Sequence, residues 1–211
     1  MNEDLGGRAM FMEELIGCFT SPRRTLKSIL EKPRLIKATG IILAIALVAA
    51  VASFNYMSKL PSDSLPRQLP LGLLEIGSGF SALIGIFGTW IISSTLTHSF
   101  AKLQRGNGSF TNFLTLAGYA SLPLLIQQLL RLMDSYVINP EGVLQFAGFQ
   151  LSAGSIVDVA ASTFSIFRIW SMILLTIATR ENYGISTAKS VICVALSFIL
   201  IVFLSMFLPL R

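Results

Sequence analysis

Five long apolar stretches constrain this chain more than any other feature of its sequence. A helix needs about 20 apolar residues to cross a hydrocarbon core of roughly 30 Å. Hydrophobic residues make up 53% of the 211 residues and charged residues only 13%, too little charge to cover a soluble domain of this size. We therefore expect an all-α integral membrane protein with five transmembrane helices. The approximate spans are 38–57, 77–101, 110–133, 156–179 and 188–208.

The basic residues predict the orientation of these spans, because cytoplasmic loops carry an excess of Lys and Arg. Seven Lys and Arg precede the first span and four more lie in the loops after the second and fourth spans, whereas four lie on the other side. We expect residues 1–37 to form a cytoplasmic N-terminal amphipathic segment. Residues 38–211 would form the transmembrane domain, with the C-terminus outside. The net charge of +5 is then an orientation signal, and we expect no nucleic-acid partner.

The N-terminal segment carries two amphipathic patterns. Helical spacing places an apolar stripe on one side of residues 9–19, formed by Met12, Leu15, Ile16 and Phe19. Ser21 and Pro22 predict the start of a second, short helix, with the hydroxyl as its cap. Its basic face comprises Arg23, Arg24 and Lys27, and its apolar face comprises Leu26, Ile29 and Leu30. Such a helix is typical of a segment in the inner membrane interface, attracted by anionic headgroups; the alternative is positive-inside charge without recognition.

Small residues recur every four positions along the second predicted span. They are Gly77, Ser81, Gly85, Thr89, Ser93 and Thr97, and Ala101 continues the series. A ridge of small residues lets another helix approach closely, and its hydroxyls can form hydrogen bonds across the contact. We expect the ridge to pack a helix of the same chain. A dimer face and a water-lined path are the alternatives.

Arg168 is the most informative single residue, because the sequence places it about 15 Å inside the fourth span. An Arg at this depth should face the bundle and find acceptors. In the third span, Pro123 cannot donate to the carbonyl of Tyr119. We expect an intramembrane polar cluster in which Arg168 bonds the freed backbone around Tyr119, with the Tyr119 phenol or Thr89 as a further partner. The alternatives are that Arg168 extends to an interface or binds an anionic substrate.

No residue pattern predicts catalysis, a cofactor or a metal site. His98 stands without a nearby cluster of Cys or carboxylates, so it makes no metal site. An intramembrane serine protease would need a His beside Ser81, but about 25 Å of the same helix separates Ser81 from His98. The turn 105–109 lacks the Lys and the spacing of a phosphate loop. Ser109 is expected to cap the third span.

Four short motifs occur in a fixed order along the chain. They are Thr20-Ser21-Pro22-Arg23-Arg24-Thr25, Gly106-Asn107-Gly108-Ser109-Phe110 followed by Tyr119-Ala120-Ser121-Leu122-Pro123, Trp170 late in the fourth span, and Tyr183-Gly184-Ile185-Ser186. Their order, their spacing and the five-span plan resemble the Yip1 family of membrane proteins. Eukaryotic members of that family resemble trafficking adaptors that associate with one another and bind Rab-type GTPases. This chain is more similar to the compact bacterial and archaeal members, so the resemblance implies a prokaryotic cell membrane and no GTPase is carried over as a partner.

Two functions fit these observations. The first is a non-enzymatic membrane scaffold or adaptor, which contacts the lipid bilayer and forms a homo-oligomer or binds another membrane protein. The second is a transporter or channel component for a small solute, with an anion as one candidate. An odd number of spans without internal repeats disfavours the usual inverted-repeat transporters.

Overall fold

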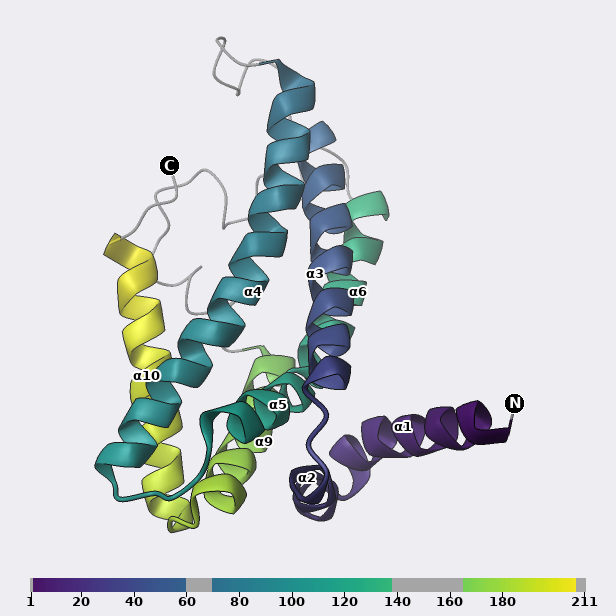
Figure 1. The fold of residues 1–211 in the computed structure, drawn as a ribbon. Helices are drawn as coiled ribbons and strands as arrows, with labels where there is room; N and C mark the ends of the chain where they lie inside the picture. The colour runs from purple at the N-terminus through teal and green to yellow at the C-terminus, as the bar shows by residue number, and fades with distance from the viewer. Residues whose placement is uncertain (1, 60–69, 138–164, 208–211) are drawn as a thin grey trace. The chain divides into compact units, whose positions relative to one another are not determined.

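The computed structural model describes residues 2–59, 70–137 and 165–207, and every secondary-structure element within these ranges is an α-helix (Figure 1). The helices are α1 (Asn2–Thr20), α2 (Pro22–Glu31), α3 (Leu35–Ser58), α4 (Leu71–Leu103), α5 (Phe110–Ala120), α6 (Leu122–Val137), α9 (Ile166–Tyr183) and α10 (Thr187–Phe207). The predicted all-α membrane fold is confirmed.

Four segments of the described residues are long and apolar enough to cross a membrane. They are Leu35–Ser58, Gly72–Leu103, Phe110–Tyr136 and Thr187–Leu204. These segments correspond to the first, second, third and fifth predicted spans. The described part of the fourth predicted span belongs to α9, and residues 156–164 of that span lie outside the described residues. The count of five spans and their orientation therefore stay predictions.

The chain divides into two compact units. Unit 1 contains residues 1–42, 88–122 and 171–211, and unit 2 contains residues 43–87 and 123–170. Unit 1 carries 12 Lys and Arg against six Asp and Glu, whereas unit 2 carries four against five. All of the excess positive charge therefore belongs to unit 1.

The third span is broken near its middle, as expected from Pro123. Helix α5 ends at Ala120 and α6 begins at Leu122. The N–H of Ser121 donates to the carbonyls of Ala117 (3.1 Å) and Gly118 (3.2 Å), and Pro123 lies in the first turn of α6, where its missing N–H is tolerated. At the other end of α5, Ser109 Oγ accepts a hydrogen bond from the N–H of Asn112 at 3.2 Å. The predicted cap is confirmed.

Helix α2 begins at Pro22 and ends at Glu31, with Ser21 and Lys32 at its two cap positions. The predicted capping bond from Ser21 is wrong, because its side chain makes no capping hydrogen bond in the described structure, and Thr25 Oγ1 donates to the Ser21 carbonyl instead. Leu26 and Ile29 are buried, and α2 packs against α1 and α5. The apolar face that we expected in the membrane interface is therefore covered by protein.

Candidate functional site

A single carboxylate ties the N-terminal helix α1 to the start of α3 and to α5 within unit 1. Glu14 accepts hydrogen bonds from Lys37 Nζ, at 3.0 Å on Oε1 and 2.9 Å on Oε2. Glu14 Oε2 also accepts from the Tyr119 hydroxyl at 2.7 Å. The charged side chains of Glu14 and Lys37 are only 17% and 15% exposed. A buried charge pair of this kind needs both partners, because either charge alone would be left uncompensated.

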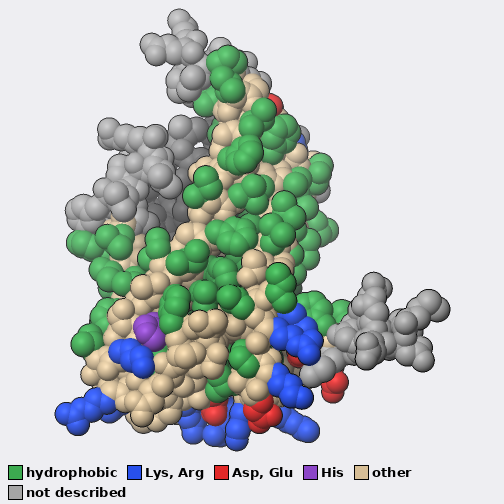
Figure 2. Space-filling view, viewed as in Figure 1, with side chains coloured by type: hydrophobic (Ala, Val, Ile, Leu, Met, Phe, Trp, Pro, Cys, Tyr) green, Lys and Arg blue, Asp and Glu red, His purple; other side chains and the backbone are tan. Residues whose placement is uncertain are grey.

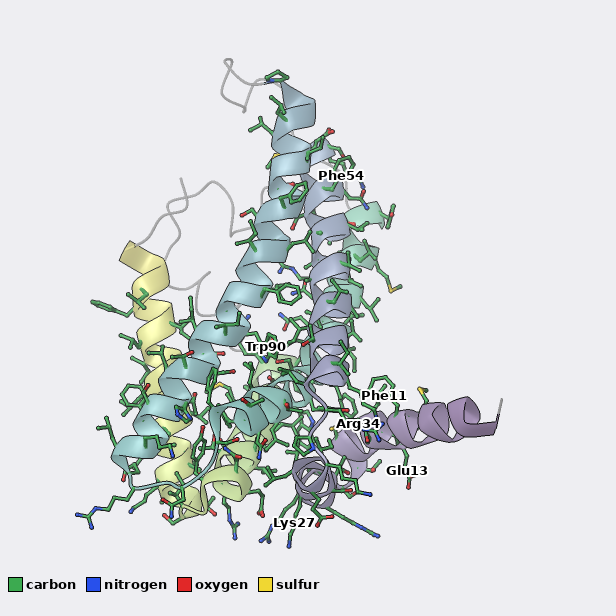
Figure 3. All side chains as sticks on the ribbon, in the orientation of Figure 1. Phe11, Glu13, Lys27, Arg34, Phe54 and Trp90 are labelled. Carbon is green, nitrogen blue, oxygen red and sulfur yellow. The ribbon has the colours of Figure 1, made fainter. Side chains whose placement is uncertain are left out.

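An aromatic contact covers the same charge pair. The ring of Phe11 meets the Tyr119 ring edge-on, with centroids 6.5 Å apart and planes at 72°. Lys37 Nζ lies 5.1 Å from the centroid of Phe11, within range of a cation–π interaction. Figure 3 shows Phe11 on α1 beside the chain that leads into α3. We call Phe11, Glu14, Lys37 and Tyr119 the docking cluster.

The sequence patterns did not single out Glu14 and Lys37, and the buried face of α1 is not the predicted apolar stripe. Phe11, Glu14 and Cys18 share one face of the helix at intervals of three and four residues, and Cys18 is fully buried. Most of the predicted apolar stripe is uncovered. Met12, Ile16 and Phe19 are exposed by 55%, 59% and 40%, and Leu15 is half-buried. The available signal was an acidic residue that shares its helix face with an aromatic residue and a cysteine.

Cys18 offers a direct measure of whether the docking cluster is intact. Burial and the nearby Glu14 carboxylate raise the pKa of its thiol to about 12, from an ordinary value of 9.0. The folded protein should therefore keep Cys18 as an unreactive neutral thiol at pH 8. An unfolded chain loses this proton from about pH 9, so the contribution of Cys18 to stability is complete below pH 9 and falls as the pH rises toward 12.

We expect slow maleimide labelling of Cys18 at pH 8 in a Cys193→Ala background. Complete and rapid labelling is expected only after denaturation. Lys27→Cys, placed in a chain without either native cysteine, is the control, because Lys27 is exposed on α2. Equal labelling rates for Cys18 and Lys27→Cys in the folded protein would contradict the buried position of Cys18.

Helices α3 and α5 approach each other closely at Gly118. A Cβ atom at Gly118 would lie 2.7 Å from Ala38 Cβ and 3.1 Å from both the Cα and the carbonyl oxygen of Ala38. Ala38 itself is fully buried. Only the missing side chain of glycine lets α5 approach the α3 backbone this closely. Lys37 and Tyr119 of the docking cluster are the sequence neighbours of Ala38 and Gly118.

The three predicted basic residues of α2 have different surroundings. Arg23 Nε forms an ion pair with Glu181 Oε1 of α9 at 2.9 Å, which gives α2 a second attachment within unit 1. The Arg23 side chain is 65% exposed, so this pair contributes little by itself. Arg24 and Lys27 are exposed on the same helix. Figure 2 shows Lys and Arg side chains gathered over this region of unit 1, and Figure 3 shows Lys27 pointing away from the helices.

Two turns of unit 1 that are far apart in sequence lie against each other. The N–H of Asn107 donates to the Tyr183 carbonyl at 3.2 Å, and Asn182 Nδ2 donates to the Ser109 carbonyl at 3.1 Å. A Cβ atom at Gly108 would collide with Asn182. The motifs at 106–110 and 183–186 are therefore two halves of one structure, which their separate positions in the sequence did not reveal.

Tyr183 connects these paired turns to α4. Its hydroxyl and His98 Nδ1 are 2.5 Å apart, and its ring packs against Phe113 with centroids 5.3 Å apart. Burial raises the pKa of the Tyr183 phenol. The phenol therefore keeps its proton and can donate a hydrogen bond to His98 Nδ1. Gly184, with φ of 66°, ends α9 in the left-handed conformation.

The predicted intramembrane polar cluster is divided between the units. Tyr119 and Thr89 belong to unit 1, whereas Pro123 and Arg168 belong to unit 2. The Tyr119 hydroxyl donates to Glu14. Arg168 Nε is buried and has no hydrogen-bond partner among the described residues. The predicted bond between Arg168 and the backbone at Tyr119 stays a prediction.

The ridge of small residues does not follow one side of α4. A spacing of four residues exceeds the helical turn of 3.6 residues, so the ridge winds around the helix. Gly77, Ser81, Gly85 and Thr89 are exposed, and Ser93 is half-buried. Thr97 is buried and donates through Oγ1 to Ser197 Oγ of α10 at 2.9 Å. The role of the ridge as a whole in helix packing stays a prediction.

The described residues contain no group of three or more His, Cys, Asp and Glu that could hold a metal ion. Within the same residues, Cys18 and Cys193 are free thiols. The arrangement in unit 1 can hold an N-terminal segment in place and present exposed basic and apolar side chains.

Comparisons with known proteins agree with this architecture. The family model of the Yip1 domain matches residues 16–208. The membrane protein YknW of Bacillus subtilis is 26% identical over 217 residues, covering 97% of this chain and 94% of the relative. An uncharacterised protein of Methanocaldococcus jannaschii is 26% identical over 132 residues, covering 62% of this chain and 94% of that protein. No solved structure matches the chain significantly. Since the family model covers most of its length, the chain belongs to the Yip1 domain family and is a multi-pass protein of a prokaryotic membrane.

Proposed function

We propose that this Yip1-family protein is a non-enzymatic membrane scaffold that binds partners through its N-terminal segment. The observation that carries the proposal is the docking of α1, which buries Glu14 and Cys18 while leaving Met12, Ile16 and Phe19 exposed. A helix held in place with an uncovered apolar stripe is typical of an interaction surface. Residues 1–37 are then the recognition segment and residues 38–211 the membrane anchor.

The charge of the two units supports a cytoplasmic position for this segment. In unit 1 Lys and Arg outnumber Asp and Glu, and in unit 2 they do not. An excess of Lys and Arg is typical of the cytoplasmic side of a membrane protein. We therefore place the N-terminus inside. With α9 as part of the fourth of five spans, the odd number of spans then places the C-terminus outside. The exposed Arg24 and Lys27 would contact anionic headgroups of the inner leaflet.

A pull-down from native membranes tests this proposal. The triple variant Met12→Gln, Ile16→Gln, Phe19→Gln should recover a specific partner protein at least fivefold less than the wild type. Leu103→Gln removes an apolar side chain that is 79% exposed at the end of α4, so it is the matched control and should recover the partner fully. Equal recovery by the triple variant and the wild type would contradict a role for the α1 stripe.

A second candidate is a transporter or channel component for a small anionic solute. The observation that favours it is the buried Nε of Arg168, which lacks a partner among the described residues. Uptake of an anion into proteoliposomes that is abolished by Arg168→Gln would support transport. Absence of anion flux with the wild-type protein would exclude it.

A further inference from the structure

Helix α4 ends in a turn whose left-handed position holds an arginine. Arg105 has a φ of 65°, and among the described residues it is the one residue other than glycine with a positive φ. Its N–H donates to the carbonyl of Lys102 at 2.9 Å, and the N–H of Gly106 donates to the carbonyl of Ala101 at 2.9 Å. These two bonds form a Schellman motif, in which glycine usually takes the left-handed position.

The end of α9 provides a comparison within the same unit. Gly184 takes the left-handed position there, and its N–H donates to the Arg180 carbonyl at 3.0 Å. At the end of α4 the glycine comes one position later, where a Cβ atom would lie 2.8 Å from Tyr183 Cβ. This contact accounts for glycine at position 106 but not for arginine at position 105. A left-handed backbone is unfavourable for a residue with a Cβ atom, so the arginine indicates a use for its side chain.

The described structure shows no use of the Arg105 side chain within the protein. The side chain is exposed, and no hydrogen bond or ion pair joins it to another described residue. A cation near the C-terminus of a helix interacts favourably with the helix dipole, but Lys102 already supplies that cation in the last turn of α4. Neither folding nor the dipole therefore accounts for an arginine at this position.

Arg105 lies where three segments long and apolar enough to cross a membrane begin or end. The segment of α4 ends at Leu103, and the segments of α5 and α10 begin at Phe110 and Thr187. The hydrogen bonds between the two turns hold these ends together (Figure 1). A chain extends at most about 3.6 Å per residue, so Arg105 lies within about 7 Å of Leu103. The headgroup region extends about 5–8 Å beyond each side of the hydrocarbon core, which places Arg105 among lipid headgroups.

The surroundings of Arg105 favour an anionic lipid as its partner. Residues 76–133 contain no Asp or Glu, and Glu181 of α9 is already paired with Arg23 at 2.9 Å. Leu103 is 79% exposed, and an exposed apolar residue flanked by cations is typical of a segment in the membrane interface. The planar guanidinium fork matches the oxygens of a phosphate.

We propose that Arg105, together with Lys102, binds the phosphate of an anionic membrane lipid. Two cations without a local carboxylate favour a headgroup with net negative charge over a zwitterionic one, whose ammonium group they would repel. The site belongs to the membrane anchor and does not involve the α1 stripe, so it can exist whether or not the scaffold proposal holds.

The test uses the full-length protein in a neutral detergent and follows its melting temperature. One arm adds phosphatidylglycerol, a second adds zwitterionic phosphatidylcholine, and a third adds inorganic phosphate against chloride at equal ionic strength. The variants are Arg105→Gly, which removes both the charge and the unfavourable backbone conformation, and Arg105→Lys, which keeps the charge. Lys32→Gln is the matched control, because it removes one exposed positive charge from the same unit.

Without added lipid, Arg105→Gly should melt at the same temperature as the wild type or a few degrees higher, because glycine adopts the left-handed conformation freely. Phosphatidylglycerol should stabilise the wild type, and phosphatidylcholine and inorganic phosphate should not. Arg105→Gly should need about fivefold more phosphatidylglycerol for half of the maximal stabilisation. Arg105→Lys should fall between the two, since it keeps the charge but loses the fork. Lys32→Gln should respond almost as the wild type does.

Four results would overturn the proposal. Equal phosphatidylglycerol dependence of the wild type and Arg105→Gly would show that the lipid does not use this arginine. An equal loss in Lys32→Gln would reduce the effect to overall surface charge. A lower melting temperature of Arg105→Gly without lipid would assign the side chain to folding. Equal stabilisation of the wild type by inorganic phosphate would assign the site to a free anion.

Discussion

Replacing Lys37 with methionine is expected to release α1 from unit 1. The substitution leaves the Glu14 carboxylate mostly buried with only the Tyr119 hydroxyl as a partner. Removing one member of a buried charge pair costs about 3 kcal/mol or more, which corresponds to roughly a hundredfold larger population of undocked α1. The rate of maleimide labelling of Cys18 at pH 8 measures this population, and we expect it to rise by about the same factor.

Two controls separate the loss of the pair from the loss of a positive charge. Lys32→Met removes an exposed lysine of the same segment and should leave the labelling of Cys18 unchanged. The double variant Glu14→Gln, Lys37→Met removes both charges and should label more slowly than Lys37→Met alone, since no uncompensated charge remains. Each labelling rate gives a free energy of undocking. If the undocking free energies of the two single variants added up to that of the double variant, the two side chains would not be coupled.

Replacing Gly118 with leucine is expected to separate α3 from α5. Even the first added atom would lie 2.7 Å from Ala38 Cβ and 3.1 Å from the α3 backbone, and backbone cannot move aside as a flexible side chain can. Overpacking of this kind typically costs about 1–3 kcal/mol, so the melting temperature in detergent should fall by several degrees. Cys18 should also become more reactive, because the docking cluster depends on the α3–α5 contact.

Gly85→Leu provides the matched control for this steric effect. Gly85 lies in the interior of α4, and nothing lies within 4 Å of a Cβ atom placed there. Leucine is a better helix former than glycine by up to about 1 kcal/mol. The melting temperature of Gly85→Leu should therefore be unchanged or higher. A fall equal to that of Gly118→Leu would show that added volume in any span, and not the contact with Ala38, destabilises the protein.

The helical fold and the class of the protein followed from local properties of the sequence. A membrane span is recognised from the summed hydropathy of about 20 neighbouring residues. In lipid, every backbone N–H and C=O must be hydrogen-bonded within the protein, which leaves few alternatives to helices. The Ser109 cap and the break near Pro123 were predictable for the same reason, since each depends on residues within one helical turn. The family resemblance depends on the order and spacing of short motifs along the chain, and it does not depend on which of them are in contact.

The docking cluster was decided by tertiary structure. The predicted apolar stripe comprises Met12, Leu15, Ile16 and Phe19 and has the spacing of a buried helix face. Three of these side chains are nevertheless exposed, and only Leu15 is half-buried. Helix α1 turns its other face inward because Glu14 finds Lys37 on α3 and the Tyr119 hydroxyl, 105 residues away, on α5. The free energy of burying a charge depends on which partners reach it, and the sequence around Glu14 carries no record of a partner so distant.

The two turns at 106–110 and 183–186 also show a difference between what local sequence predicts and what tertiary structure decides. Gly108 and Tyr183 stand out in the sequence as parts of two separate motifs, and each motif has the composition of an ordinary turn. Their relation exists only where Asn182 packs against Gly108 and Asn107 donates to the Tyr183 carbonyl. Sequence alone determined that this chain enters a membrane as helices, because hydropathy is local. Tertiary structure determined which polar residues lie together within unit 1, because the energy of a buried polar group depends on contacts between distant parts of the chain.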